Sequence, residues 1–139
     1  MKVILNKCYG GFGISLEGYK LYAKKLGRDL FVYRNNYLNH TYVKVDEDYA
    51  DFGLDFFTID LGETIGRFDI PPEVWKNDYL YLNEEHRTDS VLVEVVEELG
   101  EKANGYRAQL KVVEIPDDMK YEITDYDGIE TLHELHRVW

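Results

Sequence analysis

The chain has 139 residues, a formal net charge of −11 at pH 7 and 45% apolar residues. This length favours one domain, residues 1–139, and the apolar content excludes a disordered chain. The single cysteine, Cys8, excludes an intrachain disulfide and a zinc site made of cysteines. The negative charge argues against direct nucleic-acid binding, which relies on Lys and Arg to displace counterions from phosphates.

No apolar stretch approaches the length that spans a bilayer, and the apolar run at the start of the chain is too short for a signal peptide. We therefore expect a cytoplasmic protein without membrane contact. The charge is uneven, because residues 1–40 carry a net +5 and residues 41–139 a net −16. A basic N-terminal segment favours an anionic partner, although a charged surface of this kind also serves solubility alone.

Hydrophobic periodicity predicts strand, helix and strand in the first third of the chain. Lys2–Asn6 is a β-rich run, and residues 16–26 have helical spacing between Ser15, a good N-cap, and Gly27, a stop. The middle of the chain favours short strands at 30–34, 41–45, 56–61 and 79–82, an acidic loop at 46–55 and a turn or short helical piece at 71–75.

A second helix is predicted in the last third, capped by Thr88 or Asp89 and stopped at Asn104-Gly105. Its apolar stripe is Val91, Leu92, Val95, Val96 and Leu99. Strands follow at 107–115 and 121–124, then a turn at 126–128 and a last element at 129–139, for which we favour a strand over a helix. Two helices among six to eight strands predict an α+β fold, with a largely antiparallel sheet and two main helices packed on it.

A glycine-rich loop between the first strand and the first helix is the most suggestive local feature. Glycine lets backbone N–H groups approach a ligand, and a helix N-terminus favours anions. The loop is neither a Walker A motif nor a dinucleotide fingerprint, and a sharp turn that merely needs glycine is the competing interpretation. The candidate ligand-binding residues here are Lys7, Tyr9, Gly10, Gly11, Phe12, Gly13 and Ser15.

Arg87 is the remaining candidate ligand-binding residue. It directly precedes the predicted helix cap, where a guanidinium is not favoured by the helix dipole, and it could clamp a phosphate or carboxylate with two hydrogen bonds. The neighbouring Thr88 and Asp89 are better explained as caps.

The histidines and the cysteine do not form a recognisable reactive motif. His133 and His136 lack the His-Glu-x-x-His spacing of metalloproteases, and Cys8 is better explained as a small apolar residue than as a nucleophile. We therefore predict no catalytic residue, no metal site and no cofactor.

Three stretches form a distinctive set: NKCYGGFG at 6–13, RTD at 87–89 with ELGEKANG at 98–105, and LKVVEIPD at 110–117 followed by YDG at 126–128 and HRVW at 136–139. This set resembles a family of small, largely uncharacterised proteins of tailed phages and prophages. The likeness covers both ends of the chain and much less of residues 28–80. Ser90 departs from it where we expect proline at the first helical position. The resemblance implies a counter-defence factor or regulator in the host cell cytoplasm, and it assigns no functional residues.

Three functions remain open. The first is a phage-type counter-defence protein that sequesters a small anionic ligand without catalysis, such as a nucleotide immune signal of the cyclic ADP-ribose or cyclic dinucleotide type. The glycine-rich loop, Arg87 and twelve tyrosines able to stack on a base favour it, with a homo-oligomer completing the pocket. The second is an acidic nucleic-acid mimic that inhibits a host protein partner through the −16 segment. The third is a small phosphodiesterase or hydrolase that uses the histidines.

Overall fold

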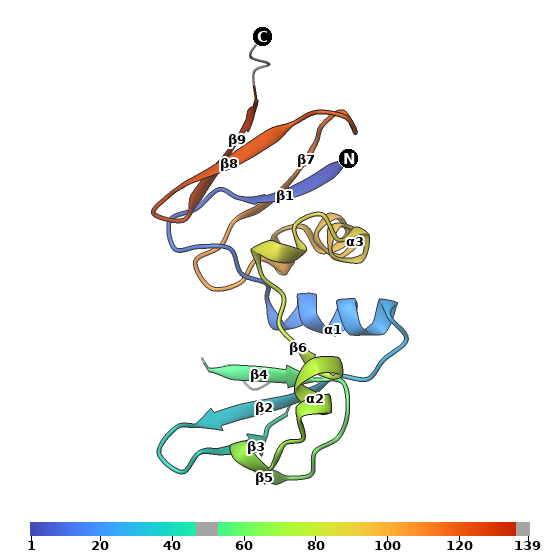
Figure 1. Ribbon diagram of the computed structural model, residues 1–139, viewed down its shortest axis with the longest axis vertical. Coiled ribbons are helices and arrows are strands. Elements are labelled where there is room, and N and C mark those ends of the chain that lie inside the picture. Colours follow the sequence, from blue (N-terminus) through green and yellow to red (C-terminus); the bar gives the residue numbers. More distant parts are fainter. Residues whose placement is uncertain (47–52, 136–139) are drawn as a thin grey trace. The chain divides into compact units, whose positions relative to one another are not determined.

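The computed structural model describes residues 1–46 and 53–135. The chain forms two compact units, which we describe separately (Figure 1). Unit 1 comprises residues 1–22 and 82–139, and unit 2 comprises residues 23–81. The first boundary lies within helix α1 (Leu16–Lys25). The predicted single domain stays a prediction, because compactness of two units does not show whether each folds alone.

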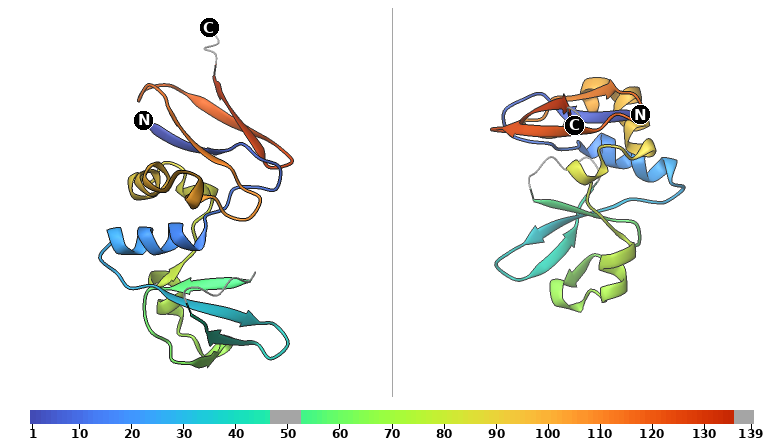
Figure 2. Two further views of the ribbon diagram at one scale, coloured as in Figure 1. Left: turned by 180° about the vertical axis from the view of Figure 1, so that it is seen from behind. Right: turned by 45° about the horizontal axis from the view of Figure 1, so that its top comes forward.

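Unit 1 contains two antiparallel strand pairs and a helix. Its strands are β1 (Lys2–Asn6), β7 (Leu110–Glu114), β8 (Tyr121–Tyr126) and β9 (Ile129–Glu134), paired as β1-β7 and β8-β9. Figure 2 shows these two pairs from behind and from above. Helix α3 (Ser90–Leu99) contacts both β1 and β7. Two short 3-10 helices flank it, η2 (Glu84–His86) and η3 (Gly100–Ala103).

Helix α3 begins where the sequence predicts and ends earlier. The side chain of Asp89 accepts hydrogen bonds from the backbone N–H groups of Val91 and Leu92, which makes Asp89 the N-cap. The C-cap is Gly100, with φ of 57°, so the predicted stop at Asn104-Gly105 is wrong. Asn104 has an extended backbone, and its side chain instead accepts a hydrogen bond from Leu110 N–H at the start of β7.

The core of unit 1 follows the predicted apolar pattern in part. Leu92, Val95 and Val96 of the predicted stripe are buried, whereas Val91 and Leu99 are half-buried and Val93, outside the predicted stripe, is buried. Four side chains of α3 are buried, and one cluster of β1 residues packs against the residues after β7 and the β8–β9 hairpin. The buried members are Leu92, Val93, Val95, Val96, Val3, Leu5 and Ile115. Residues 3–6 of β1 are all buried, so both faces of this strand are covered.

Unit 2 is a five-stranded antiparallel sheet with the order β5-β3-β2-β4-β6. Its strands are β2 (Phe31–Asn36), β3 (Thr41–Lys44), β4 (Leu54–Phe57), β5 (Thr64–Gly66) and β6 (Tyr79–Leu80), with a 3-10 helix η1 (Arg67–Asp69) and a short helix α2 (Pro72–Asn77) between β5 and β6. Pro72 suits the first turn of α2, because the missing proline N–H has no helical partner there.

The core of unit 2 is aromatic. Tyr33, Tyr42 and Phe57 are buried on one face of the sheet, and Trp75 of α2 packs on them with its ring centroid 5.5 Å from that of Phe57. The hydroxyl of Tyr33 donates to Gly62 O and accepts from Leu61 N, both at 2.9 Å. Aromatic rings supply large buried area, and the tyrosine hydroxyl needs such partners once buried.

The predicted α+β class, with antiparallel strands and two main helices, is confirmed. The last element is strand β9 as far as Glu134, as favoured from the sequence, while residues 136–139 lie outside the described part. The predicted strand at 107–115 begins only at Leu110, because Arg107 has a left-handed backbone with φ of 58°. Within the described ranges, no helix is both long enough and apolar enough to cross a membrane.

Candidate functional site

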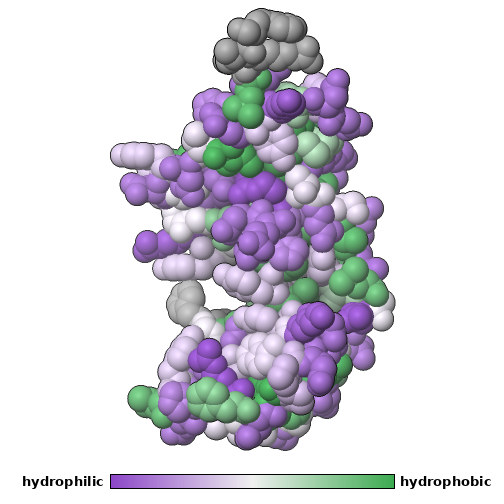
Figure 3. Space-filling model, in the orientation of Figure 1, coloured by the Kyte–Doolittle hydropathy of each residue, from purple (hydrophilic) through white to green (hydrophobic). Residues whose placement is uncertain are grey.

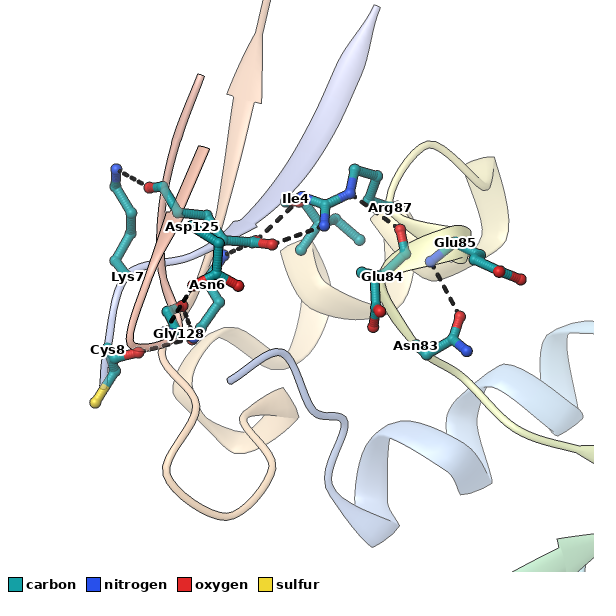
Figure 4. Close-up of polar contacts among 11 residues, drawn as sticks. Ile4, Asn6, Lys7, Cys8, Asn83, Glu84, Glu85, Arg87, Asp125 and Gly128 are labelled. Atoms are coloured by element: carbon teal, nitrogen blue, oxygen red, sulfur yellow. Dashed lines mark hydrogen bonds and ion pairs between the residues drawn. The ribbon is translucent and has the colours of Figure 1, made fainter. Parts of the chain in front are cut away.

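Arg87 of unit 1 is held in an ion pair. Its two terminal nitrogens contact the two carboxylate oxygens of Glu130 at 2.7 and 3.1 Å, and the side chains are 14% and 7% exposed. The guanidinium also donates to the backbone carbonyls of Ile4 and Glu84 (Figure 4). This two-pronged geometry is the strong form of a guanidinium–carboxylate pair, and it uses the charge that we expected to bind an anion.

Lys7 and Arg87 converge on the same residue. The Lys7 ammonium donates to Glu130 O at 2.8 Å, and the backbone N–H of Asn6 donates to the Glu130 carboxylate at 2.8 Å. Asn6 is fully buried, and its side-chain amide donates to Cys8 O and Gly128 O (Figure 4). The amide oxygen accepts from Gln109 N. The polar groups around Glu130 therefore satisfy one another within the chain.

The loop aromatics behave differently from each other. The Arg87 guanidinium lies 5.4 Å from the centroid of the Phe12 ring, which covers one face of the cation. Tyr9 is 61% exposed. Phe12 thus belongs to the Arg87–Glu130 cluster, while Tyr9 is directed to solvent.

The first two loop glycines lie against the β8–β9 turn, and the glycine that this close packing requires is Gly128. Gly10 and Gly11 have φ of 127° and 124°, and Gly10 N donates to Asp127 O at 3.1 Å. A Cβ placed on Gly128 would lie 2.5 Å from Gly11 N, and one placed on Gly10 would lie 2.5 Å from the Cβ of Arg107. Only glycine permits this approach of two backbone segments.

The rest of the loop is tied to the segment after α3. Gly13 O accepts from Gly105 N at 2.9 Å, and Ser15 N donates to Ala103 O at 2.9 Å. The Ser15 hydroxyl accepts from Gly18 N at 3.1 Å, which confirms it as the N-cap of α1, and donates to Lys102 O at 2.5 Å. These contacts attach the loop to the rest of unit 1, and ligand binding by the loop stays a prediction.

Two of the three described histidines lie beside polar side chains. His133 lies on β9 with Nε2 3.1 Å from Thr124 Oγ1, and His86 Nδ1 lies near the Asn83 side chain. His136 lies outside the described residues. Across 1–46 and 53–135, no three His, Cys, Asp or Glu side chains are grouped as they would be around a metal ion.

A depression on unit 2 offers different chemistry. It measures about 400 Å³ and is lined by Arg67, Phe68, Ile70 and Trp75. Phe68 is 81% exposed, whereas Ile70 is 4% exposed and forms part of the aromatic core. Figure 3 shows hydrophobic side chains exposed among hydrophilic ones in the part of the picture that holds β2–β5.

Arg67 differs from Arg87 in its surroundings. Among the described residues, no carboxylate lies within ion-pair distance of Arg67, and its backbone N–H donates to His40 O at 2.7 Å. Burial and a hydrogen bond to Asp55 raise the pKa of Tyr42, and the positive charge of Arg67 opposes that rise. The guanidinium of Arg67 is thus close enough to Tyr42 to influence its pKa, and it forms no ion pair with a described carboxylate.

Sequence reasoning did not identify this depression. The available signal was Arg67-Phe68 between Gly66 and the Pro71-Pro72 pair, which places a cation and an aromatic residue in a short segment without room for a strand or long helix. We read the pair of prolines only as a turn or short helical piece.

The acidic surface is partly neutralised on α3. Glu97, on its exposed face, contacts the ammonium of Lys2 at 3.0 Å. Inhibition of a host protein through acidic residues remains a prediction.

Comparison of the chain with family models, with curated proteins and with solved structures gave no match.

Proposed function

We propose that this protein binds and sequesters a small anionic ligand without transforming it, and that the depression at Arg67 is the binding site. The observation that carries the proposal is an exposed arginine with no carboxylate partner among the described residues, in a depression with an exposed aromatic ring. Arginine binds phosphate and carboxylate groups through paired hydrogen bonds, and its charge here is available to a ligand.

The proposal keeps the predicted class of ligand and moves the site away from Lys7 and Arg87. Arg87 would have to give up Glu130 to bind an anion, and Glu130 would then be a buried carboxylate without its main partner. Arg67 can bind an anion without breaking an ion pair among the described residues. The resemblance to phage proteins supports a counter-defence role, in which the ligand is a nucleotide immune signal.

The overall negative charge favours a small ligand over a polyanion. A net charge of −11 repels nucleic acid at long range, but screening limits that repulsion to about 8 Å at physiological ionic strength. A small anion therefore reaches a local cation that a long polyanion would approach only against the remaining charge.

Thermal unfolding in the presence of inorganic phosphate, pyrophosphate, cyclic ADP-ribose and a cyclic dinucleotide tests the proposal. A ligand at a hundred times its dissociation constant stabilises the folded state by about 2.7 kcal/mol, which raises the Tm by several degrees. Arg67→Gln should abolish the increase, while Lys24→Gln, which removes one exposed positive charge outside the depression, should leave it unchanged.

The ligand recovered after incubation separates binding from catalysis. Chromatography should return it intact. A converted ligand would show an enzyme instead, and the absence of a Tm increase with every anion, or an undiminished increase in Arg67→Gln, would refute the site.

A further inference from the structure

The depression is built from one continuous segment, residues 67–75, that joins η1 to α2. Gly66 pairs with Thr41 in the sheet and Arg67 N–H donates to His40 O, so the start of the segment is anchored to the β2–β3 hairpin. Pro71 and Pro72 then restrict the backbone between the two aromatic residues. The spacing of the walls is therefore held by the backbone.

One wall and the floor are rigid. The Trp75 ring lies 5.1 Å from Tyr79, 5.5 Å from Phe57 and 6.1 Å from Tyr42, measured between ring centroids. Ile70 is 4% exposed beneath them. A side chain held by three other rings cannot turn away, so this wall keeps its shape when a ligand arrives.

The other wall is an exposed ring with little support. Phe68 is 81% exposed, and the ring of His40 lies beside it, at 5.6 Å between centroids. An exposed phenylalanine contributes almost nothing to the folded core, and it offers a flat surface on which another ring can stack.

From these features we infer that the depression takes a ligand with one flat ring and one phosphate-like group, that is, a nucleoside monophosphate. The inference rests on the proposed function and names its ligand class. One guanidinium can hold one phosphate with paired hydrogen bonds, and a volume of about 400 Å³ is near the small end of ligand pockets. A cyclic dinucleotide has two phosphates and two bases, whereas the depression offers one guanidinium and one exposed ring.

Calorimetric titration of the full chain with adenosine monophosphate, adenosine and ribose 5-phosphate tests this directly. The first carries both groups, and the other two carry one each. We expect adenosine monophosphate to bind at least about tenfold more tightly than ribose 5-phosphate, because stacking of a base on an aromatic ring has about that value.

Two variants separate the ring from the charge. Phe68→Ala should weaken the binding of adenosine monophosphate about tenfold and leave the binding of ribose 5-phosphate unchanged. Tyr81→Ala, which removes another exposed ring of unit 2, should change neither affinity. Arg67→Gln should weaken the binding of both adenosine monophosphate and ribose 5-phosphate. Phe68 is exposed, so its removal should not unfold the chain, and thermal unfolding of each variant verifies this.

The outcomes distinguish the two proposals. Equal affinity for adenosine monophosphate and ribose 5-phosphate, unchanged in Phe68→Ala, would overturn the nucleotide inference and leave the anion site standing. Failure of both phosphates to bind, or equal binding by Arg67→Gln and the unmodified protein, would overturn the anion site and the nucleotide inference with it.

Discussion

Arg87 and Glu130 lie 43 positions apart in the chain and form a two-pronged ion pair in which both side chains are largely buried. The pair joins the segment before α3 to strand β9, and Asn6 N–H and Lys7 attach β1 and its following residue to the same glutamate. Three segments of unit 1 are thus joined at one carboxylate. Arg87, which we selected as a candidate ligand contact, thus has its charge paired within the folded chain.

We predict that Glu130→Gln destabilises the protein by about 3–5 kcal/mol, because it leaves the Arg87 charge buried without its partner. Replacing both residues by methionine should cost less than either single change, since no buried charge then remains. Urea denaturation measures these differences. Glu97→Gln, which breaks the exposed pair with Lys2, should cost much less, because solvent screens an exposed ion pair. Equal costs for Glu130→Gln and Glu97→Gln would contradict the prediction.

Gly128→Ala should destabilise the protein more than Gly27→Ala. Both glycines have positive φ, 95° and 70°, so alanine at either position carries a backbone cost of about 1–2 kcal/mol. A Cβ at Gly128 would also meet the backbone of Gly10 and Gly11, whereas nothing lies within 4 Å of one at Gly27. The additional cost should be about 1–3 kcal/mol. Equal unfolding free energies would show that the loop moves aside easily.

The parts of the fold that sequence reasoning predicted are those set by neighbouring residues. Ser15 and Asp89 are helix caps because their side chains reach N–H groups two or three positions further on, and that spacing is visible in the sequence. The turn at Asp127-Gly128 is likewise local, since both residues have left-handed φ. The error at Asn104-Gly105 has the same origin, because Gly100 is an equally good local stop that lies four residues earlier.

The role of each arginine depended on distant residues and could not be predicted. Nothing local distinguishes Arg87, whose carboxylate partner lies on β9, from Arg67, which has none among the described residues. Glu130 is one of 27 acidic residues, and folding makes it the buried one among those that the structure describes. Polar pairs formed across long sequence separations leave no periodic signal, so the sequence could not show which arginine has a buried carboxylate partner.

Asp89→Ala should cost about 1 kcal/mol through loss of the α3 cap, with a further loss because the Tyr22 hydroxyl, 2.7 Å from the Asp89 carboxylate, loses its acceptor. Asp89→Asn is the matched control, since asparagine caps a helix about as well. Circular dichroism during urea denaturation measures both variants. A cost for Asp89→Asn as large as that for alanine would show that the charge, rather than the cap, stabilises this helix.

Stability should fall at alkaline pH, in part through Tyr22. Burial and the hydrogen bond to Asp89 raise the pKa of Tyr22 above its ordinary value of 10.0. Above that pH the unfolded chain loses this proton while the folded chain retains it, so the unfolded state is favoured as the pH rises. The Tyr22 contribution is therefore fully present below pH 10 and declines above it, by up to about 1.4 kcal/mol per pH unit.

In Tyr22→Phe the unfolding free energy should fall less steeply above pH 10 than in the unmodified protein, whereas Tyr9→Phe, at a position 61% exposed, should keep the original slope. Parallel slopes for all three proteins would show that Tyr22 titrates equally in both states.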